Sequence, residues 1–276
     1  MTASSTTTAK ARIEFDRVSV RFPAGGGGEM KVVDDVSYRI HDREFVSVIG
    51  PSGCGKTTMM NIVAGFMRPS AGAVMLDGRP IDGPGPERGV IFQEYGVFPW
   101  LTVRQNIEFG LKLGANRTGA AERDEICRRY MGLMGLADFA DAWPRMLSGG
   151  MRQRLALARA YAVKPQFLLM DEPFGALDAQ TRSAMQDLLL EVLAAEGKTV
   201  MLITHSVEEA IYLSNRIVVM TARPTRIREI VDVPFAYPRT DSLHESKAFG
   251  ELRAHVRDIV MQEYAEQAKQ REQVSG

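Results

Sequence analysis

The sequence predicts an α/β fold built around a parallel sheet, and three stretches carry this prediction. Residues 44–49 form an apolar, strand-like run that leads directly into a glycine-rich loop, and residues 57–65 then have helical spacing. Residues 166–170 are continuously apolar, as expected for a strand buried on both faces. A helical pattern at 179–195 followed by a strand at 199–203 completes a β–α–β unit, which favours parallel strands.

The composition is that of a globular protein with no net charge. The chain has 276 residues, enough for one large α/β domain or for that domain with a small appendage. Hydrophobic residues make up 45% and charged residues 25%. Because 34 basic and 34 acidic side chains cancel, nothing global favours nucleic acid or an anionic membrane. No apolar run approaches the roughly 18 to 20 residues of a membrane helix, and two cysteines suit a reduced, cytosolic setting.

Further regions are predicted before and between the sheet strands. Residues 1–10 are rich in Ser, Thr and Ala, lack the apolar core of a signal peptide, and are predicted to be a disordered tail. Residues 12–15 and 18–22 alternate as strands do, and the glycines at 25–28 predict a hairpin tip. Residues from about 95 to 163 are predicted to be a helical insertion between two halves of the sheet domain.

The C-terminal region, residues 233–276, is predicted to be an extension that is only partly helical. Pro234 and Pro238 make its first part irregular. The second part has the spacing of an amphipathic helix, whose apolar face consists of Leu252, Val256, Ile259 and Val260.

A phosphate-binding loop connects the predicted strand at 44–49 to the following helix. Its sequence matches the pattern G-x-x-x-x-G-K-[ST] in the required order of strand, loop and helix, which disfavours a purely structural glycine turn. Glycines let backbone N–H groups point inward at phosphates, and the helix dipole adds positive potential. Lys56 supplies a charge for the β- and γ-phosphates of a nucleotide, and the Thr57 hydroxyl is placed for Mg²⁺. The predicted binding residues are Gly50, Pro51, Ser52, Gly53, Cys54, Gly55, Lys56, Thr57 and Thr58.

Two carboxylates follow the apolar strand at 166–170. Asp171 and Glu172 emerge at its carboxyl end, where α/β sheets bind their ligands. We expect Asp171 to hold Mg²⁺ and Glu172 to act as the general base toward the attacking water. The alternative is a solvent-facing pair at a helix start, which the presence of Lys56 in the same chain disfavours.

A second glycine motif, the octet Leu147–Arg154, decides between kinds of nucleotide-binding protein. Ser148, Gly149 and Gly150 precede a predicted helix at 151–162, and such a start is either an ordinary N-cap or an anion site. Together with the phosphate loop, the octet resembles the nucleotide-binding subunit of an ABC transporter. The resemblance implies a P-loop NTPase (RecA-like) core with an antiparallel β subdomain and an inserted α-helical subdomain, with the ABC ATPase domain spanning residues 11–232.

The same resemblance implies a paired architecture and several further site residues. In this family the serine-glycine motif contacts the γ-phosphate of ATP held on the other subunit, so we expect a head-to-tail homodimer, or a pair with another ABC subunit, binding ATP and Mg²⁺. Gln93 is similar to the glutamine that meets Mg²⁺ and senses the membrane partner. Asp178 lies in the segment that crosses the dimer interface. His205 matches the histidine that contacts the γ-phosphate and orders water, and Phe22 matches the aromatic residue that stacks on adenine.

The amino-acid sequences of three segments narrow the resemblance to the importers of this family. Residues 173–178 resemble bacterial importer ATPases, while residues 93–103 and 222–227 resemble the nitrate, sulfonate and taurine importer group. The resemblance implies a peripheral ATPase at the cytoplasmic face of the bacterial inner membrane that powers uptake of a small anionic solute. Its partners would be transmembrane permease subunits contacting the Gln93–Trp100 region and a periplasmic solute-binding protein, and no nucleic acid.

Three alternatives remain open from the sequence. Trp100 either lines the groove that receives a short helix of the permease or is a core tryptophan beside a turn. The chain as a whole is either an importer ATPase or a soluble ABC ATPase acting on nucleic acid or ribosomes, although it lacks paired halves, coiled-coil insertions and basic arms. A catalytically inactive scaffold is disfavoured because the candidate catalytic residues Lys56, Glu172 and His205 are all present. Finally, Cys54 lies in the phosphate loop, and we expect a bulky thiol reagent to inhibit through it.

Overall fold

A computed structural model describes residues 11–24, 27–93 and 96–275 of the chain. The predicted disordered tail at 1–10 lies outside the described residues. So do two glycines of the predicted hairpin tip, at 25–26, and positions 94–95 of the predicted permease-contacting region.

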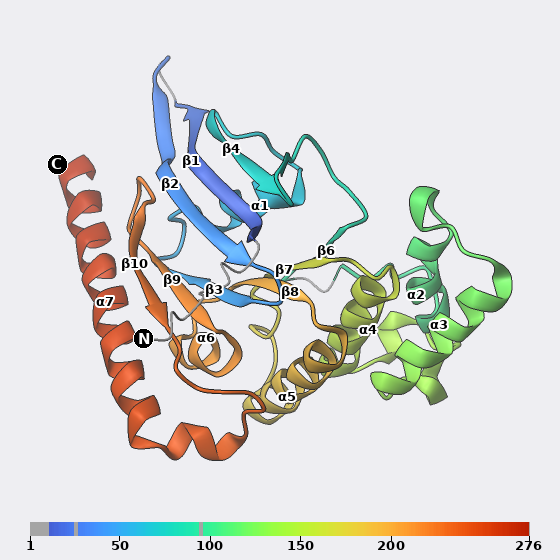
Figure 1. Cartoon of the computed structure of the whole chain (residues 1–276). Coiled ribbons are helices and arrows are strands. Elements are labelled where there is room, and N and C mark those ends of the chain that lie inside the picture. The colour runs from blue at the N-terminus through green and yellow to red at the C-terminus, as the bar shows by residue number, and fades with distance from the viewer. Residues whose placement is uncertain (1–10, 25–26, 94–95, 276) are drawn as a thin grey trace, which may run out of the picture.

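Two sheets of different kinds form the framework (Figure 1). The first is antiparallel, in the order β2-β1-β4-β5, with β1 Ala11–Pro23, β2 Glu29–His41, β4 Ala71–Leu76 and β5 Arg79–Pro80. The second has the order β10-β9-β3-β8-β7-β6, with β3 Phe45–Ile49, β6 Arg88–Ile91, β7 Phe167–Asp171, β8 Thr199–Ile203, β9 Arg216–Met220 and β10 Ile227–Asp232. Its strands are parallel except that β10 runs antiparallel to β9. The prediction of an α/β fold with a parallel sheet and an antiparallel β region is confirmed.

The described chain contains seven α-helices: α1 Lys56–Ala64, α2 Val103–Leu111, α3 Ala120–Leu133, α4 Gly149–Ala162, α5 Ala179–Glu196, α6 Val207–Leu213 and α7 Lys247–Ser275. Helices α2 and α3 gather with α4 at one side of the molecule, away from the antiparallel sheet (Figure 1). Their buried residues join those of β7, β8 and α5 in one core. Helix α1 follows the phosphate loop and packs in a second core, between the two sheets.

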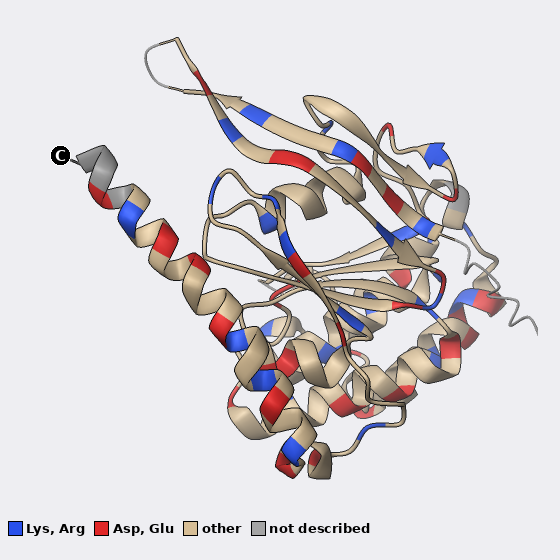
Figure 2. Cartoon of the chain, turned by 60° about the vertical axis from the view of Figure 1, so that its left-hand side comes forward, with Lys and Arg blue, Asp and Glu red and all other residues tan. Residues whose placement is uncertain are grey.

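Helix α7 covers the β9–β10 side of the sheet (Figure 1). Val256, Ile259 and Val260 are buried against Val219 and Val231, and Leu252 packs at the edge of the same cluster. The apolar face predicted for this helix is therefore the face that it buries. Figure 2 shows acidic and basic residues interleaved along the rest of α7. None of the described helices is long and apolar enough to cross a membrane.

Two side chains of α7 reach beyond the sheet to loops near the phosphate-binding segment. Glu263 Oε2 accepts a hydrogen bond from the backbone N–H of Ala222, at 3.0 Å. Gln267 Nε2 donates to the carbonyl oxygen of Ser52 in the phosphate loop, at 3.1 Å. The last helix is thus attached both to the sheet and to the loop that follows β3.

Candidate nucleotide site

The phosphate loop runs from the carboxyl end of β3 to the start of α1, as the sequence predicts. Gly55 has a φ of 131°, and a Cβ there would lie only 3.1 Å from both Thr225 Oγ1 and Val32 Cγ1. Gly53 has a φ of 73°, again in the left-handed region where glycine is favoured. These two positions therefore need glycine for the loop to close tightly against β2 and against the segment that follows β9.

Lys56 lies inside this loop. Its Nζ donates to the carbonyl oxygens of Gly50, at 2.8 Å, and Pro51, at 2.9 Å, and the residue is only 7% exposed. An ammonium group has three donors, so one remains for a ligand in the loop. The loop consequently presents a fixed, almost buried positive charge.

Thr57 and Asp171 come together although they are far apart in the sequence. The Thr57 hydroxyl at the start of α1 donates to Asp171 Oδ2 at the end of β7, at 3.1 Å. Burial raises the pKa of Asp171, and the nearby Glu172 raises it further, whereas the Thr57 hydrogen bond and Lys56 lower it. A hydroxyl and a carboxylate oxygen side by side suit Mg²⁺, which takes a few protein oxygens together with phosphate and water. Gln93 follows β6 and is exposed, and it is not among the residues that line the cavity.

Glu172 and His205 also meet across neighbouring strands. His205 Nδ1, just after β8, lies 3.2 Å from Glu172 Oε2. Glu172 has a φ of 44°, a left-handed conformation that is strained for a non-glycine residue, and its N–H donates to the carbonyl oxygen of Ile203 at 2.9 Å. The backbone therefore holds the Glu172 carboxylate in a defined place beside the histidine.

A cavity of about 340 Å³ opens above these groups. Phe22 lines it, as expected for the predicted adenine-stacking residue, together with its cross-strand partner Met30. The complete lining is Phe22, Met30, Val32, Ser52, Gly53, Gly55, Lys56, Thr57, Thr58, Glu172, Ile203 and Arg223. Sequence reasoning missed Met30, Val32, Ile203 and Arg223, since the contacts that bring them here are long-range.

The serine-glycine start of α4 lies elsewhere in the chain. Ser148 is the N-cap of α4, and its Oγ accepts the N–H of Met151 at 3.3 Å. Gly150 packs on α5, where a Cβ would lie 2.6 Å from Thr181 Cγ2. Asp178 caps α5 by accepting the N–H of Thr181 at 3.0 Å, and this hydrogen bond lowers the pKa of its carboxyl. Ser148, Gly149, Gly150 and Asp178 do not line the cavity of their own chain.

An exposed aromatic patch, formed by Phe98, Trp100 and Phe109, lies beside the helical region. Trp100 is 66% exposed and stacks on Phe98, with ring centroids 5.5 Å apart. Phe98 in turn contacts Phe109 at 4.5 Å, and the Arg159 guanidinium lies 4.2 Å above the Phe98 ring. Asn106 fixes the segment by donating to the carbonyl oxygen of Leu101 at 2.9 Å and accepting the Phe98 N–H at 2.8 Å. The alternative that Trp100 is a core residue is wrong.

Cys54 is fully buried in the core between the two sheets. Its carbonyl oxygen accepts a hydrogen bond from the Thr225 hydroxyl. The expectation that a bulky thiol reagent acts through Cys54 in the folded chain is wrong, because the sulfur has no exposed surface. Cys127 is likewise buried, and burial raises the pKa of its thiol.

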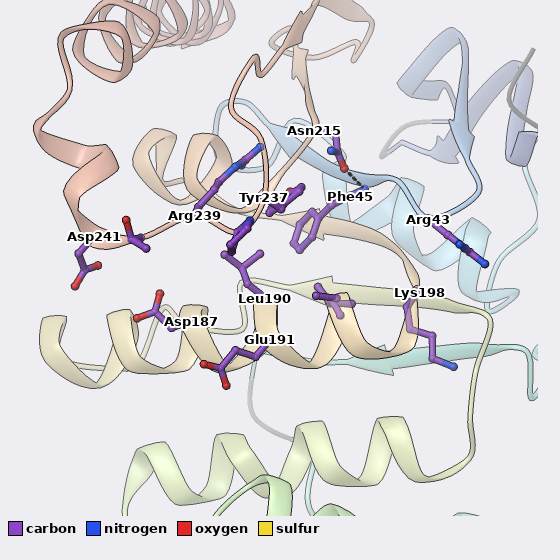
Figure 3. Close-up of a pocket in the computed structure, with 15 residues that line it drawn as sticks. Arg43, Phe45, Asp187, Leu190, Glu191, Lys198, Asn215, Tyr237, Arg239 and Asp241 are labelled. Carbon is purple, nitrogen blue, oxygen red and sulfur yellow. Dashed lines mark hydrogen bonds between the residues drawn. The ribbon is translucent and has the colours of Figure 1, made fainter. Parts of the chain in front are cut away.

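A second, larger cavity of about 750 Å³ lies near the amino ends of strands of the parallel sheet, away from the phosphate loop (Figure 3). It is bounded by Phe45 at the start of β3, by Leu190 on α5, and by Tyr237 in the segment that leads to α7. Proteins with α/β sheets bind their ligands at the carboxyl ends of the parallel strands, whereas this cavity lies at the amino ends. The smaller cavity above the phosphate loop is therefore the candidate nucleotide site.

The fold and the loop define the class of protein: a P-loop ATPase whose parallel sheet carries an antiparallel sheet and an inserted group of helices. The sequence profile described as ABC transporter matches residues 33–175 of the chain. The chain belongs to the ABC transporter family, as one of its ATP-hydrolysing cassettes.

Relatives cover almost the whole chain. A putative ATP-binding protein of Brucella abortus is 54% identical over 90% of this chain and 92% of its own length. A taurine import ATP-binding protein of Jannaschia sp. is 44% identical over 88% of this chain and 91% of its own, and a nitrate import ATP-binding protein of Synechococcus elongatus is 39% identical over 92% and 93%. Among solved structures, a dimeric ATP-binding cassette bound to ADP and Pi is similar with a TM-score of 0.70 and 28% identity, covering 81% of this chain and all of that one.

Proposed function

We propose that the chain is the ATP-hydrolysing subunit of a bacterial ABC importer that takes up a small anionic solute of the nitrate, sulfonate or taurine type. The exposed aromatic patch around Trp100 carries this proposal, because it offers a docking surface on the helical side of an ATPase that has no membrane helix among its described residues. The names of the taurine and nitrate import relatives support the solute class. The proposed location is the cytoplasmic face of the inner membrane.

In the proposed site, ATP occupies the cavity with its phosphates in the loop. Lys56 and the N–H groups of the loop bind the β- and γ-phosphates, and the base lies toward Phe22. Thr57 and Asp171, together with Gln93 from the segment after β6, would hold Mg²⁺, which supplies positive charge to the phosphates. Lys56 neutralises charge that develops during hydrolysis.

The remaining chemistry falls to Glu172 and His205. The Glu172 carboxylate accepts a proton from the attacking water, and His205, 3.2 Å away, orients the carboxylate and contacts the γ-phosphate. The water must approach in line with the bond that breaks, between the γ-phosphorus and the bridging oxygen, so that ADP leaves with that oxygen.

The second half of each site is proposed to come from a second copy of the chain. Ser148, Gly149 and Gly150 lie at the start of α4, where Ser148 is exposed and Gly149 half-buried, and they stand apart from the cavity of their own chain. A head-to-tail pair would bring them, and Asp178, to the γ-phosphate held by the partner. The dimeric ADP-bound cassette to which this chain is similar supports such a pairing.

The proposed membrane partner docks on the segment from Gln93 to Trp100, and a periplasmic binding protein delivers the solute to it. In the proposed division of the chain, residues 11–232 form the ATPase with its helical insertion at about 95–163, and residues 233–276 form the extension that carries α7. Figure 2 shows basic and acidic residues mixed along the strands and helices, and nucleic acid is not among the proposed partners.

The test is affinity purification from bacterial membranes of the chain and of its Trp100→Ala variant. A multi-spanning membrane protein should copurify with the parent chain and be reduced severalfold with the variant, while nucleotide affinity of the isolated variant is unchanged. Trp143→Ala is the matched control, since Trp143 is also exposed, at 39%. Copurification of ribosomes or nucleic acid in place of a membrane protein would contradict the importer.

A further inference from the structure

Arg223, in the turn after β9, lines the nucleotide cavity, yet neither the loop motif nor the catalytic carboxylates account for it. Its Nη2 donates to the carbonyl oxygen of Gly53, at 2.5 Å, and its Nη1 lies 3.2 Å from the sulfur of Met30. Gly53 belongs to the phosphate loop, whereas Met30 is the cross-strand partner of Phe22. The guanidinium therefore spans the space between the phosphate end of the cavity and its aromatic end.

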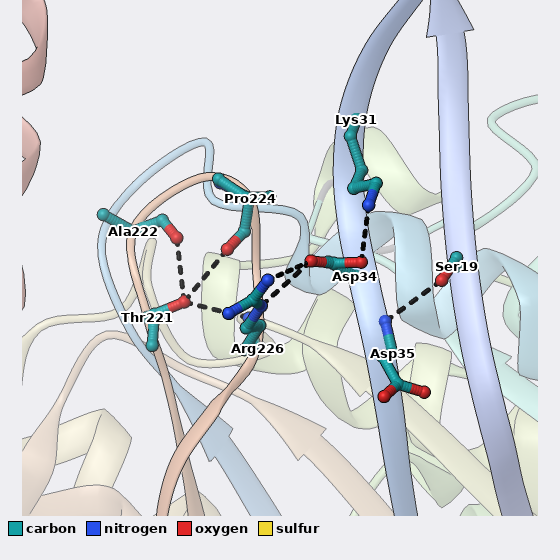
Figure 4. A network of polar contacts seen from close by, with 8 residues as sticks. All are labelled: Ser19, Lys31, Asp34, Asp35, Thr221, Ala222, Pro224 and Arg226. Atoms are coloured by element: carbon teal, nitrogen blue, oxygen red, sulfur yellow. Dashed lines mark hydrogen bonds and ion pairs between the residues drawn. The ribbon is translucent and has the colours of Figure 1, made fainter.

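The turn that carries Arg223 is held from three sides. Thr225 exchanges backbone hydrogen bonds with β2, donating to Val32 at 2.8 Å and accepting from Asp34 at 2.9 Å, and its hydroxyl donates to the carbonyl oxygen of Cys54. Arg226 pairs with the Asp34 carboxylate, which also accepts from Lys31 at 2.8 Å (Figure 4). The hydrogen bonds from Lys31 and then from Arg226 lower the pKa of Asp34. From the third side, Glu263 of α7 accepts the N–H of Ala222.

This fixed turn makes Arg223 a preorganised cation. A guanidinium carries five N–H donors, and Arg223 directs two nitrogens at Gly53 and Met30, which leaves further donors for a ligand. The neighbouring charge in the cavity, Lys56, sits deeper, on the carbonyl oxygens of Gly50 and Pro51. A nucleotide whose base lies at Phe22 and whose terminal phosphates lie at Lys56 has its α-phosphate between the two.

We propose that Arg223 binds the α-phosphate of the nucleotide and positions it between the phosphate loop and the aromatic end of the cavity. The inference rests on the proposed assignment of this cavity to ATP. Guanidinium groups suit phosphate oxygens in charge and geometry, and such charge-assisted hydrogen bonds are stronger than neutral ones. Because ATP, ADP and GTP share the α-phosphate, Arg223 should act on all three alike and should not select the base.

The test measures dissociation constants of ATP, ADP and GTP for the purified full chain, by calorimetry at several salt concentrations. Arg223→Gln keeps a donor for the Gly53 carbonyl but loses the charge, and Arg223→Lys keeps the charge. We expect Arg223→Gln to weaken all three nucleotides by a similar factor, about tenfold to a hundredfold, and to make binding less sensitive to salt. Arg223→Lys should recover part of the affinity and most of the salt sensitivity.

Two further variants separate the explanations. Arg21→Ala removes an equal charge one residue from Phe22, on an exposed side chain outside the cavity, and should leave binding unchanged. Lys56→Ala tests the cavity itself: if it has no effect, the proposed nucleotide site is wrong. If Lys56→Ala weakens binding while Arg223→Gln does not, the inference about Arg223 alone is overturned. If Arg223→Gln weakens only the adenine nucleotides, the residue acts on the base and the inference is overturned. If affinity falls while its salt dependence is unchanged, Arg223 is a purely structural tether and the inference is likewise overturned.

Discussion

Replacing Glu172 with glutamine should separate ATP binding from ATP hydrolysis. The amide has the size of the carboxylate, and its oxygen can still accept from His205 Nδ1, which lies 3.2 Å from Glu172 Oε2 in the parent chain. The left-handed φ of 44° costs glutamine what it costs glutamate, so the backbone should not move. What is lost is the proton acceptor. Removing a general base slows the chemical step by about 10²- to 10⁴-fold.

Binding should survive because the residues that hold the phosphates are untouched. Lys56 keeps its two hydrogen bonds to the loop, and Thr57 keeps its bond to Asp171. If each nucleotide is closed in by Ser148 of a second copy, unhydrolysed ATP will hold the two chains together. The Glu172→Gln protein should therefore become a dimer with ATP and magnesium and remain a monomer with ADP.

Light scattering after size exclusion, at several protein concentrations, measures this shift, and phosphate release measures the rate. The double variant Glu172→Gln, Ser148→Arg is the control, since the large side chain at the α4 start should block the partner's γ-phosphate and abolish dimerisation. Turnover close to that of the parent would refute Glu172 as the base. A monomer under every condition would refute the shared site.

Two other perturbations test individual contacts. Because burial raises the pKa of Asp171 above its unfolded value, the stability that it contributes is complete below the ordinary carboxyl range, near pH 4, and is lost as the pH rises through the raised pKa. Asp171→Asn should therefore raise the melting temperature of the nucleotide-free chain above that of the parent at neutral pH but not at pH 4. Magnesium-dependent hydrolysis should fall. The same difference in melting temperature between variant and parent at both pH values would contradict the burial argument. Gly150→Ala places a Cβ 2.6 Å from Thr181 Cγ2 and should destabilise the packing of α4 on α5 by about 1 to 3 kcal/mol in thermal or urea unfolding. Thr181→Ser removes that methyl group and should restore most of the loss, and the absence of rescue would count against this contact.

The sequence predicts the strands of the parallel sheet well because each is a short apolar run with clear ends. The run at 199–203 coincides with β8, and β7 begins one residue after the predicted start. The strands β4 and β5 were missed, since a few residues of sheet carry little periodicity. The start of α4 lies two residues before its predicted start, because Gly149 and Gly150 are helical although glycine disfavours helices.

The candidate site is predictable to the extent that its chemistry is local in the sequence. Lys56, Thr57 and Asp171 belong to compact motifs, and the structure places them in contact or in the same loop. Arg223 lies 170 positions from Gly53, and only the folded chain brings the two together. Cys54 shows the reverse error: a residue inside a loop motif looks accessible in sequence, but its side chain points into the core.

The attachment of α7 to the phosphate loop has an evolutionary consequence. Gln267 holds the Ser52 carbonyl from a helix that contains none of the motifs by which this family is recognised. Substitutions in α7 can therefore alter how tightly the loop is held while every catalytic signature stays identical. Two such ATPases with the same motifs need not share the same nucleotide affinity, because the difference can lie in a helix outside those motifs.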